Sequence, residues 1–202
     1  QGNFNGVFPP GKKDPVLAAT VLENLLNAHV SVYKHLKGLP GGSEANIGLV
    51  KNIFQFEPIR RWHILDWVFS NVLNDVFTNS TLELLKHGKS TFYLPGMVSK
   101  EMKNPMAVGT LDFIGLNYYS RMHVKGQLSL KEPFSFEKRE NDIQTDMDYA
   151  LYPEGFYKAL HTISTLNKPI YVTENGVADR GGTIRTLFIN RYLYALKMAL
   201  KD

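Results

Sequence analysis

The chain contains no cysteine among its 202 residues. Disulfide bonds and zinc sites with thiolate ligands are therefore excluded, while the redox state of the compartment stays open. The sequence also lacks any run of about 18 apolar residues, which is the length that a membrane-spanning helix requires. We accordingly expect no membrane partner.

A signal peptide is also missing from the visible amino terminus, because no basic segment followed by an apolar stretch occurs there. A cytoplasmic location is the default expectation, provided that the true amino terminus lies within this sequence. Apolar content of 44% and charged content of 21% are typical of an ordinary globular protein. We expect one domain over residues 1–202.

Basic residues are in small excess, with 23 Lys and Arg against 19 Asp and Glu, and a net charge of +4. They stand singly or in pairs, as in Lys12-Lys13 and Arg60-Arg61, with acidic residues between them. Because neither a dense basic stripe nor a nucleic-acid motif accompanies this charge, we expect a solvated surface and no nucleic-acid partner.

The six histidines are scattered and form no H-x-x-x-H or H-E-x-x-H pair. A catalytic zinc site is therefore not expected, and no other metal site is indicated. His29 lies on an otherwise apolar helical face, where we expect a histidine whose hydrogen bonds are satisfied within the protein.

Helical and strand-like segments alternate along the chain. Asp14 and Pro15 are typical of a helix start, and the helix is expected to end at Lys37-Gly38, with Gly38 as the C′ residue. Its apolar stripe is Ala18, Val21, Leu22, Leu25, His29, Val32, Tyr33 and Leu36. Further helices are expected from Trp62 to Val76, from Tyr152-Pro153 onward and from Ile184 to the end.

Short apolar strands are expected at residues 47–50, 111–116 and 169–173, and residues 121–148 read as a long polar loop. Strands that alternate with amphipathic helices predict an α/β fold with parallel βαβ units, whose ligands bind at the carboxyl ends of the strands. Three strands are too few for a closed barrel and leave an open sheet poorly covered.

The segment Tyr171-Val-Thr-Glu-Asn-Gly-Val-Ala178 places the carboxylate of Glu174 where an apolar strand breaks into a turn. A carboxylate at the mouth of a parallel strand is held rigidly and faces a cleft, as a nucleophile requires. Asn-Gly between extended segments is also the commonest tight-turn dipeptide, so the segment by itself favours a hairpin, and the other parts of the chain reverse that preference.

Three segments together resemble glycoside hydrolase family 1, the β-glucosidase-like retaining glycosidases. Residues 169–179 resemble the nucleophile signature of that family, residues 112–120 its sixth-strand motif, and residues 152–157 the helix start between them. Gly6-Val-Phe-Pro-Pro-Gly11 and Asn24-Leu-Leu-Asn-Ala-His29 are weaker matches. All five follow the order of the family.

The resemblance implies a partial (β/α)₈ barrel that covers about strands five to seven. It also implies that Glu174 is the nucleophile of β-glycoside hydrolysis, that Tyr119 orients it and that Asn117 contacts the sugar. The substrate would be a small β-glycoside, and no cofactor would be needed. Residues 117 and 119 share a strand face and Tyr118 faces the other way, so Tyr118 is expected to be a packing residue.

The acid/base motif of the family, T-x-N-E-P, does not occur in the chain. Other carboxylates are present (Glu57, Asp66, Glu154 and Asp179), but none stands at a comparable strand end. The chain therefore resembles an internal piece of a longer enzyme, and by itself it is expected to be inactive. A carbohydrate-binding or interaction module and a truncated reading frame remain as alternatives.

Overall fold

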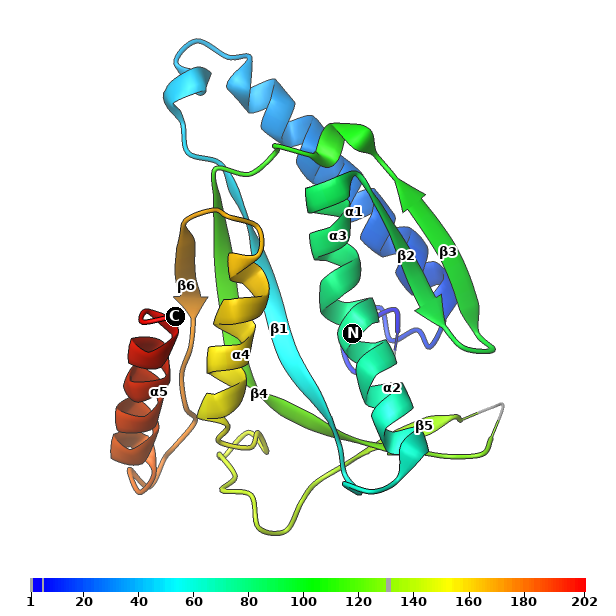
Figure 1. Ribbon diagram of the computed structural model, residues 1–202, viewed down its shortest axis with the longest axis vertical. Helices are drawn as coiled ribbons and strands as arrows, with labels where there is room; N and C mark the ends of the chain where they lie inside the picture. Colours follow the sequence, from blue (N-terminus) through cyan, green and yellow to red (C-terminus); the bar gives the residue numbers. More distant parts are fainter. Residues whose placement is uncertain (1, 5, 130–131) are drawn as a thin grey trace. The chain divides into compact units, whose positions relative to one another are not determined.

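The structure, a computed structural model, describes residues 2–4, 6–129 and 132–202. Its backbone divides into two compact units, one formed by residues up to Leu49 with Asp75–Phe113, the other by Val50–Asn74 with Ile114–Asp202 (Figure 1). The expectations for the amino-terminal segment and for the 121–148 loop include residues 1, 5, 130 and 131, which lie outside the described residues. No described helix is both long and apolar enough to cross a membrane.

The first unit begins with helix α1, Pro15–Lys37, at the bounds that the sequence predicts. Asp14 caps it, since its side chain accepts a hydrogen bond of 2.9 Å from the backbone N–H of Leu17. Gly38 was expected to be the C′ residue, but it is the C-cap. Its φ of −81° is right-handed, and its N–H continues the helical pattern to the carbonyls of Lys34 and His35.

The apolar stripe predicted for α1 is displaced from the face that is buried. The buried side chains are Ala19, Leu26 and Val30, whereas Leu25 and Val32 are 63% and 54% exposed. Apolar residues extend around much of this helix, and periodicity alone does not say which of them is covered. The expectation for His29 is confirmed, because its Nε2 lies 2.7 Å from the carbonyl oxygen of Thr110.

The rest of the first unit contains a hairpin that the sequence analysis did not predict. The π-helical turn Asp75–Asn79 and α3, Ser80–His87, lead into the antiparallel strands β2, Lys89–Leu94, and β3, Val98–Lys103. Short 3₁₀ turns occupy Gly42–Glu44 and Pro105–Ala107. The sequence did not indicate this hairpin because few of its residues are apolar. In its two strands only Phe92, Leu94 and Met102 are buried.

Asp112 has the backbone role that its position before a strand predicts. Its carboxylate accepts hydrogen bonds from the Ile47 N–H at 2.8 Å and the Tyr33 hydroxyl at 2.9 Å, and it pairs with Lys37 at 2.8 Å. These donors, Lys37 foremost, lower the pKa of Asp112 to about 2. Asp112 therefore stays ionised and joins the segment before the next strand to α1.

The second unit is built on one sheet, in which strand β4 is central (Figure 1). β4, Phe113–Gly126, lies between β1, Gly48–Pro58, on one edge and two shorter strands on the other. Its first half pairs in parallel with β6, Ile170–Glu174, and its second half pairs antiparallel with β5, Phe134–Glu137. The prediction of an unstructured loop over 121–148 is therefore wrong at 121–126 and 134–137.

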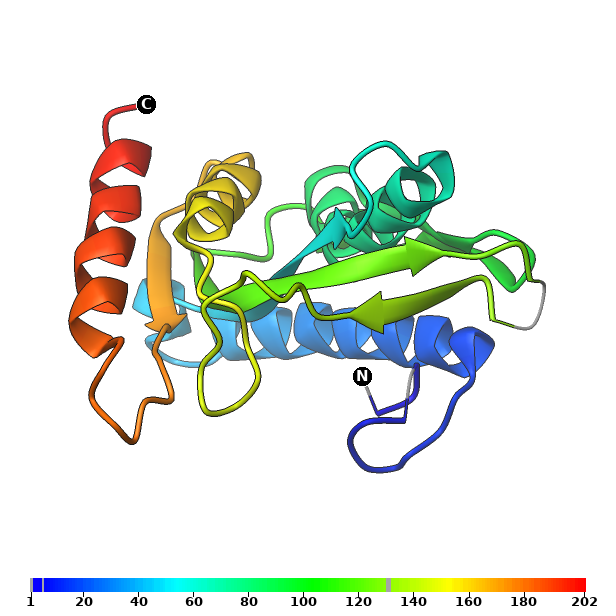
Figure 2. The same cartoon turned by 90° about the horizontal axis from the view of Figure 1, so that it is seen from below.

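Three helices accompany this sheet: α2, Ile64–Asn74, α4, Pro153–Ser164, and α5, Arg185–Ala199. Figure 2 shows α2 and α4 on the same face of β4. Tyr118 of β4 is fully buried there, and its ring contacts those of Phe156 and Tyr192. Gly155 is required under this ring, because a Cβ at that position would lie 2.1 Å from the Tyr118 hydroxyl.

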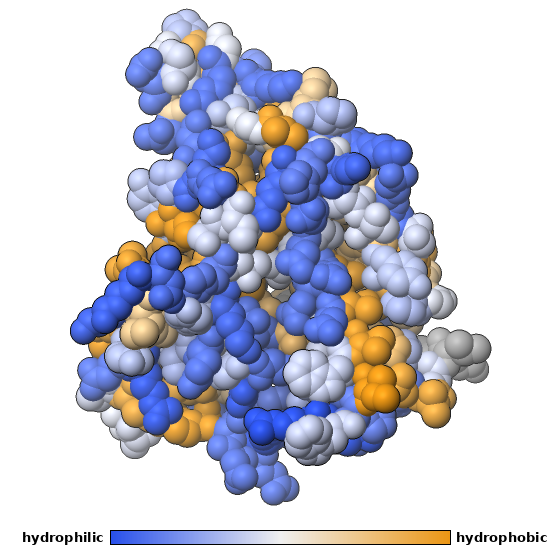
Figure 3. All heavy atoms as spheres, in the orientation of Figure 1, coloured by the Kyte–Doolittle hydropathy of each residue, from blue (hydrophilic) through white to orange (hydrophobic). Residues whose placement is uncertain are grey.

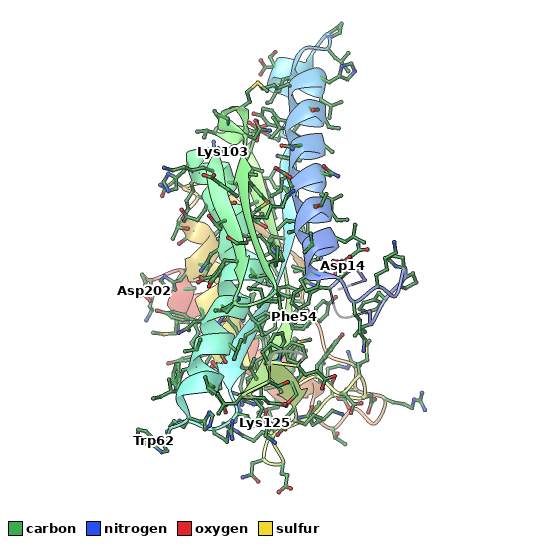
Figure 4. All side chains as sticks on the ribbon, turned by 90° about the vertical axis from the view of Figure 1, so that its right-hand side faces the viewer. Asp14, Phe54, Trp62, Lys103, Lys125 and Asp202 are labelled. Atoms are coloured by element: carbon green, nitrogen blue, oxygen red, sulfur yellow. The ribbon has the colours of Figure 1, made fainter. Side chains whose placement is uncertain are left out.

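Trp62 was predicted to begin the second helix, and this prediction is wrong. The residue precedes α2 and is 91% exposed, and its side chain points away from the ribbon (Figure 4). Apolar residues also gather over the first turns of α2 in Figure 3, where Ile64 and Val68 are exposed. Apolar residues at helical spacing begin before the first residue of α2, so the predicted helix included Trp62.

Asp66 is the fully buried carboxylate that joins α2 to the strand ends. It accepts hydrogen bonds from the Gly126 N–H at 2.8 Å, the Arg60 N–H at 3.0 Å and the Arg60 guanidinium at 2.7 and 2.9 Å. Burial opposes ionisation, but these donors outweigh it and hold the pKa of Asp66 below its usual range. Asp66 is therefore a structural residue, not a free acid.

We expect Asp66→Asn to lower the free energy of unfolding by about 3 kcal/mol, because it leaves Arg60 without its buried partner. Since the folded pKa is depressed, the contribution of Asp66 is present above its ordinary pKa and is lost as pH falls toward the folded value. Urea denaturation followed by circular dichroism at neutral and acidic pH measures both effects.

Asp148→Asn is the matched control, because Asp148 is an exposed partner of Lys138 at 2.8 Å and its positive φ of 61° tolerates asparagine. Its effect should stay within about 0.5 kcal/mol. Equal urea midpoints for the two variants would contradict the structural role of Asp66.

Candidate functional site

The candidate site lies where β6 ends beside β4. The two strands pair in parallel with Ile114 opposite Ile170, Gly115 opposite Tyr171 and Leu116 opposite Val172. The next partners are Asn117 and Glu174, so the register shifts by one residue at Thr173. A parallel pair joined through α4 is the βαβ arrangement. The element that follows Asn175-Gly176 is α5 and not a strand, so the hairpin interpretation is wrong.

Glu174 and Tyr119, both predicted site residues, are brought into direct contact. The Tyr119 hydroxyl donates a hydrogen bond of 2.9 Å to Oε2 of Glu174. This bond raises the pKa of the Tyr119 phenol, and partial burial and the charge of Glu174 add to the effect. Tyr119 is therefore a neutral donor that holds one oxygen of an exposed carboxylate.

Asn117, the third predicted residue, lies directly opposite Glu174 in the register. Its Oδ1 accepts a hydrogen bond of 2.6 Å from the hydroxyl of Thr173. This bond occupies the carboxamide oxygen and leaves the amide nitrogen available for another partner. Because of the shift in register, the partner of Asn117 is Glu174 and not Thr173.

Two further residues hold the site together and were not singled out in the sequence analysis. Asn175 donates a hydrogen bond of 2.7 Å to the carbonyl of Tyr118, which ties the turn after β6 to β4. Tyr149, in the predicted loop, has its ring 6.3 Å from that of Tyr119. Asn175 was visible within the 171–178 segment, but no local pattern identified Tyr149, because its contact joins distant parts of the chain.

Packing behind β4 supports the site from the other face. Tyr118 is buried, as predicted, and its hydroxyl donates to the carbonyl of Tyr152 at 2.8 Å. The hydroxyl of Tyr192 accepts from the Tyr152 N–H and donates to the Tyr119 carbonyl, both at 3.2 Å. These bonds join β4 to the start of α4 and to α5, and they fix the backbone on either side of Tyr119.

The other carboxylates considered in the sequence have different roles. Asp179 caps α5, since its side chain accepts hydrogen bonds from the backbone N–H groups of Thr183, Ile184 and Arg185. Glu154 lies exposed in the first turn of α4, as the sequence predicts. The described part of the chain contains no group of three or more His, Asp or Glu side chains arranged to hold a metal ion.

Comparison with known proteins gives a consistent result over the whole chain. The family model described as glycosyl hydrolase family 1 matches residues 1–202. β-Glucosidase A of Thermotoga maritima is 31% identical over 189 residues, which cover 88% of this chain and 41% of that protein. A β-galactosidase of Pyrococcus woesei is 26% identical over 226 residues, covering 96% of this chain and 42% of the relative.

The solved structure of a β-glycosidase from Pyrococcus horikoshii is also similar to this chain. The TM-score is 0.83 at 30% sequence identity, and the match covers 100% of this chain and 45% of that structure. Such neighbours are (β/α)₈-barrel glycosidases, and the α/β architecture observed here is consistent with part of that barrel. The chain thus spans less than half the length of these relatives.

We expect Glu174→Gln to lower the pKa of Tyr119 toward the ordinary phenol value of about 10. The carboxylate stabilises the neutral phenol as an acceptor and repels the phenolate, so loss of its charge eases deprotonation. Carbon NMR of ζ-labelled tyrosine across alkaline pH measures this, with Tyr119→Phe to assign the resonance.

Glu140→Gln serves as the control, since Glu140 is an exposed acid of the same unit and the substitution removes the same charge. The pKa of Tyr119 should not respond to it. A similar decrease in both variants would indicate a general charge effect and would contradict the specific contact with Glu174.

Proposed function

Because this chain belongs to glycosyl hydrolase family 1, we propose that it carries the nucleophile half of a retaining β-glycosidase site. Glu174 attacks the anomeric carbon of a β-glycoside, and the bond to the leaving oxygen breaks as the glycosyl–carboxylate ester forms. Water later cleaves this ester and restores the carboxylate. The observation that carries the proposal is the 2.9 Å contact between Tyr119 and Glu174 at the end of a parallel strand.

Tyr119 supports this role by orienting the carboxylate. Its hydrogen bond fixes one oxygen and limits the rotation of the group before attack. Asn117 is proposed to contact the sugar through the amide nitrogen, since its oxygen is occupied by the Thr173 hydroxyl. Neither role requires a cofactor or a metal ion.

The acid/base group is proposed to lie outside this chain. A retaining glycosidase places its two carboxyl groups about 5 Å apart. Asp66 is buried in its own network and Asp179 caps α5, so neither is free for this task. We propose that residues 1–202 form one partial barrel domain with β1, β4 and β6 as strands five to seven, and that a small β-glucoside or a related β-glycoside is the substrate.

A 2-deoxy-2-fluoro-β-glucoside with a dinitrophenolate leaving group tests the nucleophile alone. This leaving group departs without general-acid help, and the fluorine slows hydrolysis of the covalent product. Intact mass spectrometry should show the gain of one fluorosugar, and peptide mapping should locate it at Glu174.

Glu174→Ala should abolish the mass gain, while Glu154→Ala, which removes an exposed acid from the same unit, should leave it unchanged. A gain that maps to another residue, or no gain in the unsubstituted chain, would contradict a positioned nucleophile. Unactivated glucosides such as cellobiose should not be turned over, because their leaving oxygen needs an acid.

Tyr119→Phe should slow the labelling of Glu174 by roughly tenfold to a hundredfold, the effect of one hydrogen bond to a charged group. Tyr194→Phe is the matched control, because this tyrosine is 64% exposed on α5 and lacks contact with Glu174. The rate of mass gain at several reagent concentrations separates a slower attack from weaker binding. Equal rates in both variants would show that the Tyr119 hydroxyl does not assist the attack.

A further inference from the structure

A second candidate site lies in the same unit, in a pocket of about 430 Å³ lined by residues of β1, α2, β4 and α4. Four cationic side chains line it: Arg61, Arg121, Arg139 and Lys158. Glu57 is the single carboxylate among the lining residues. A pocket of this size accommodates a small organic molecule.

Helices α2 and α4, which contribute lining residues, lie on the same face of β4 (Figure 2). Neither Tyr119 nor Glu174 is among the residues that line the pocket. The pocket is therefore separate from the proposed nucleophile site, although both belong to one unit.

Glu57 is already fully engaged within the pocket. Its Oε1 lies 2.9 Å from Lys158 Nζ and accepts a hydrogen bond from the Tyr152 hydroxyl, while its Oε2 lies 3.1 Å from Arg121. Burial opposes its ionisation, but these donors hold the pKa of Glu57 below its ordinary value. One carboxylate thus stabilises two of the four cations.

Arg121 receives a second anion from outside the pocket, because its Nη2 lies 2.6 Å from Asp142. The positive charges of Arg121 and Lys158 are thus balanced by Glu57 and Asp142, and those of Arg61 and Arg139 are not. The guanidinium of Arg139 donates to the Ile59 carbonyl at 3.0 Å, and neither arginine forms an ion pair with any described residue. A cleft lined by cations concentrates positive potential and attracts small anions.

The lining also provides two buried polar atoms that are free to bind a ligand. The hydroxyl of Ser70 and the Nε of Arg121 are buried and have no hydrogen-bond partner among the described residues. Trp67 is 47% exposed, and its ring is held by a hydrogen bond of 2.8 Å to the Arg61 carbonyl. The guanidinium groups suit the charged end of a small molecule, and the fixed indole of Trp67 offers a flat surface for the rest of it.

We propose that this pocket binds a phosphate group, either as inorganic phosphate or as the end of a small phosphate monoester. Arg61 and Arg139 bind the phosphate oxygens, since planar guanidinium groups match the geometry of an oxyanion. The rest of a monoester lies against Trp67. The pocket volume exceeds what phosphate alone fills, which favours the ester.

Nitrogen–proton NMR of the full chain during titration with sodium phosphate tests the site directly. Saturable shifts are expected for the Trp67 indole and for the backbone amides of Ser70 and Asn71, with a dissociation constant in the millimolar range or below. Arg61→Gln should weaken binding roughly tenfold, the effect of one hydrogen bond to a charged group. Arg180→Gln removes the same charge from an exposed position outside the lining and should leave the affinity unchanged.

Three further titrations decide between the remaining explanations. Sodium chloride at equal ionic strength should not reproduce the shifts, and an equal response would overturn the proposal as simple charge screening. Ribose 5-phosphate that binds more tightly than phosphate supports the monoester, and equal affinity supports free phosphate. Ribose that binds as well as its phosphate, or equal losses in Arg61→Gln and Arg180→Gln, would also overturn it.

Glu174→Gln should leave the phosphate affinity unchanged, because Glu174 is not among the residues that line the pocket. This variant separates the two sites experimentally. Phosphate binding that persists when Glu174 cannot be labelled would support the pocket independently of the proposed glycosidase role. Absence of saturable shifts in a chain whose Glu174 is labelled would overturn the phosphate site alone.

Discussion

Strand β4 is the element on which the second unit depends, because it hydrogen-bonds to β1 along one edge and to both β6 and β5 along the other. Successive side chains of β4 point to opposite faces of the sheet, so the adjacent residues Tyr118 and Tyr119 lie in different environments. Tyr119 contacts the carboxylate of Glu174, whereas Tyr118 is buried against Phe156 and Tyr192. A one-residue slip of this strand would exchange the two rings and remove the site.

Hydrogen bonds from two tyrosine hydroxyls hold the backbone of β4 in place beside the site. Tyr118 bonds to the carbonyl of Tyr152, and Tyr192 bridges the Tyr152 N–H and the Tyr119 carbonyl. Each hydroxyl forms hydrogen bonds to the backbone, and one such bond typically contributes about 1 kcal/mol to stability. The same residues therefore contribute to stability and fix the strand that presents Tyr119.

The second unit also carries two sites of different chemistry. One presents a single exposed carboxylate with a neutral phenol donor, which suits attack on an electrophilic carbon. The other presents Arg61 and Arg139 beside a carboxylate that other cations already neutralise.

Much of the local structure was predictable, because its determinants lie close together in the sequence. Asp14-Pro15 specifies the start of α1, Tyr152-Pro153 the start of α4, and the apolar run before Glu174 the strand β6. Family motifs identified Glu174, Tyr119 and Asn117 as a group. Only the tertiary structure revealed the outward position of Trp62, the extension of β4 past Ser120 and the β2–β3 hairpin. These depend on which surfaces are covered and which strands find partners, and such long-range contacts leave no periodic signal in the chain.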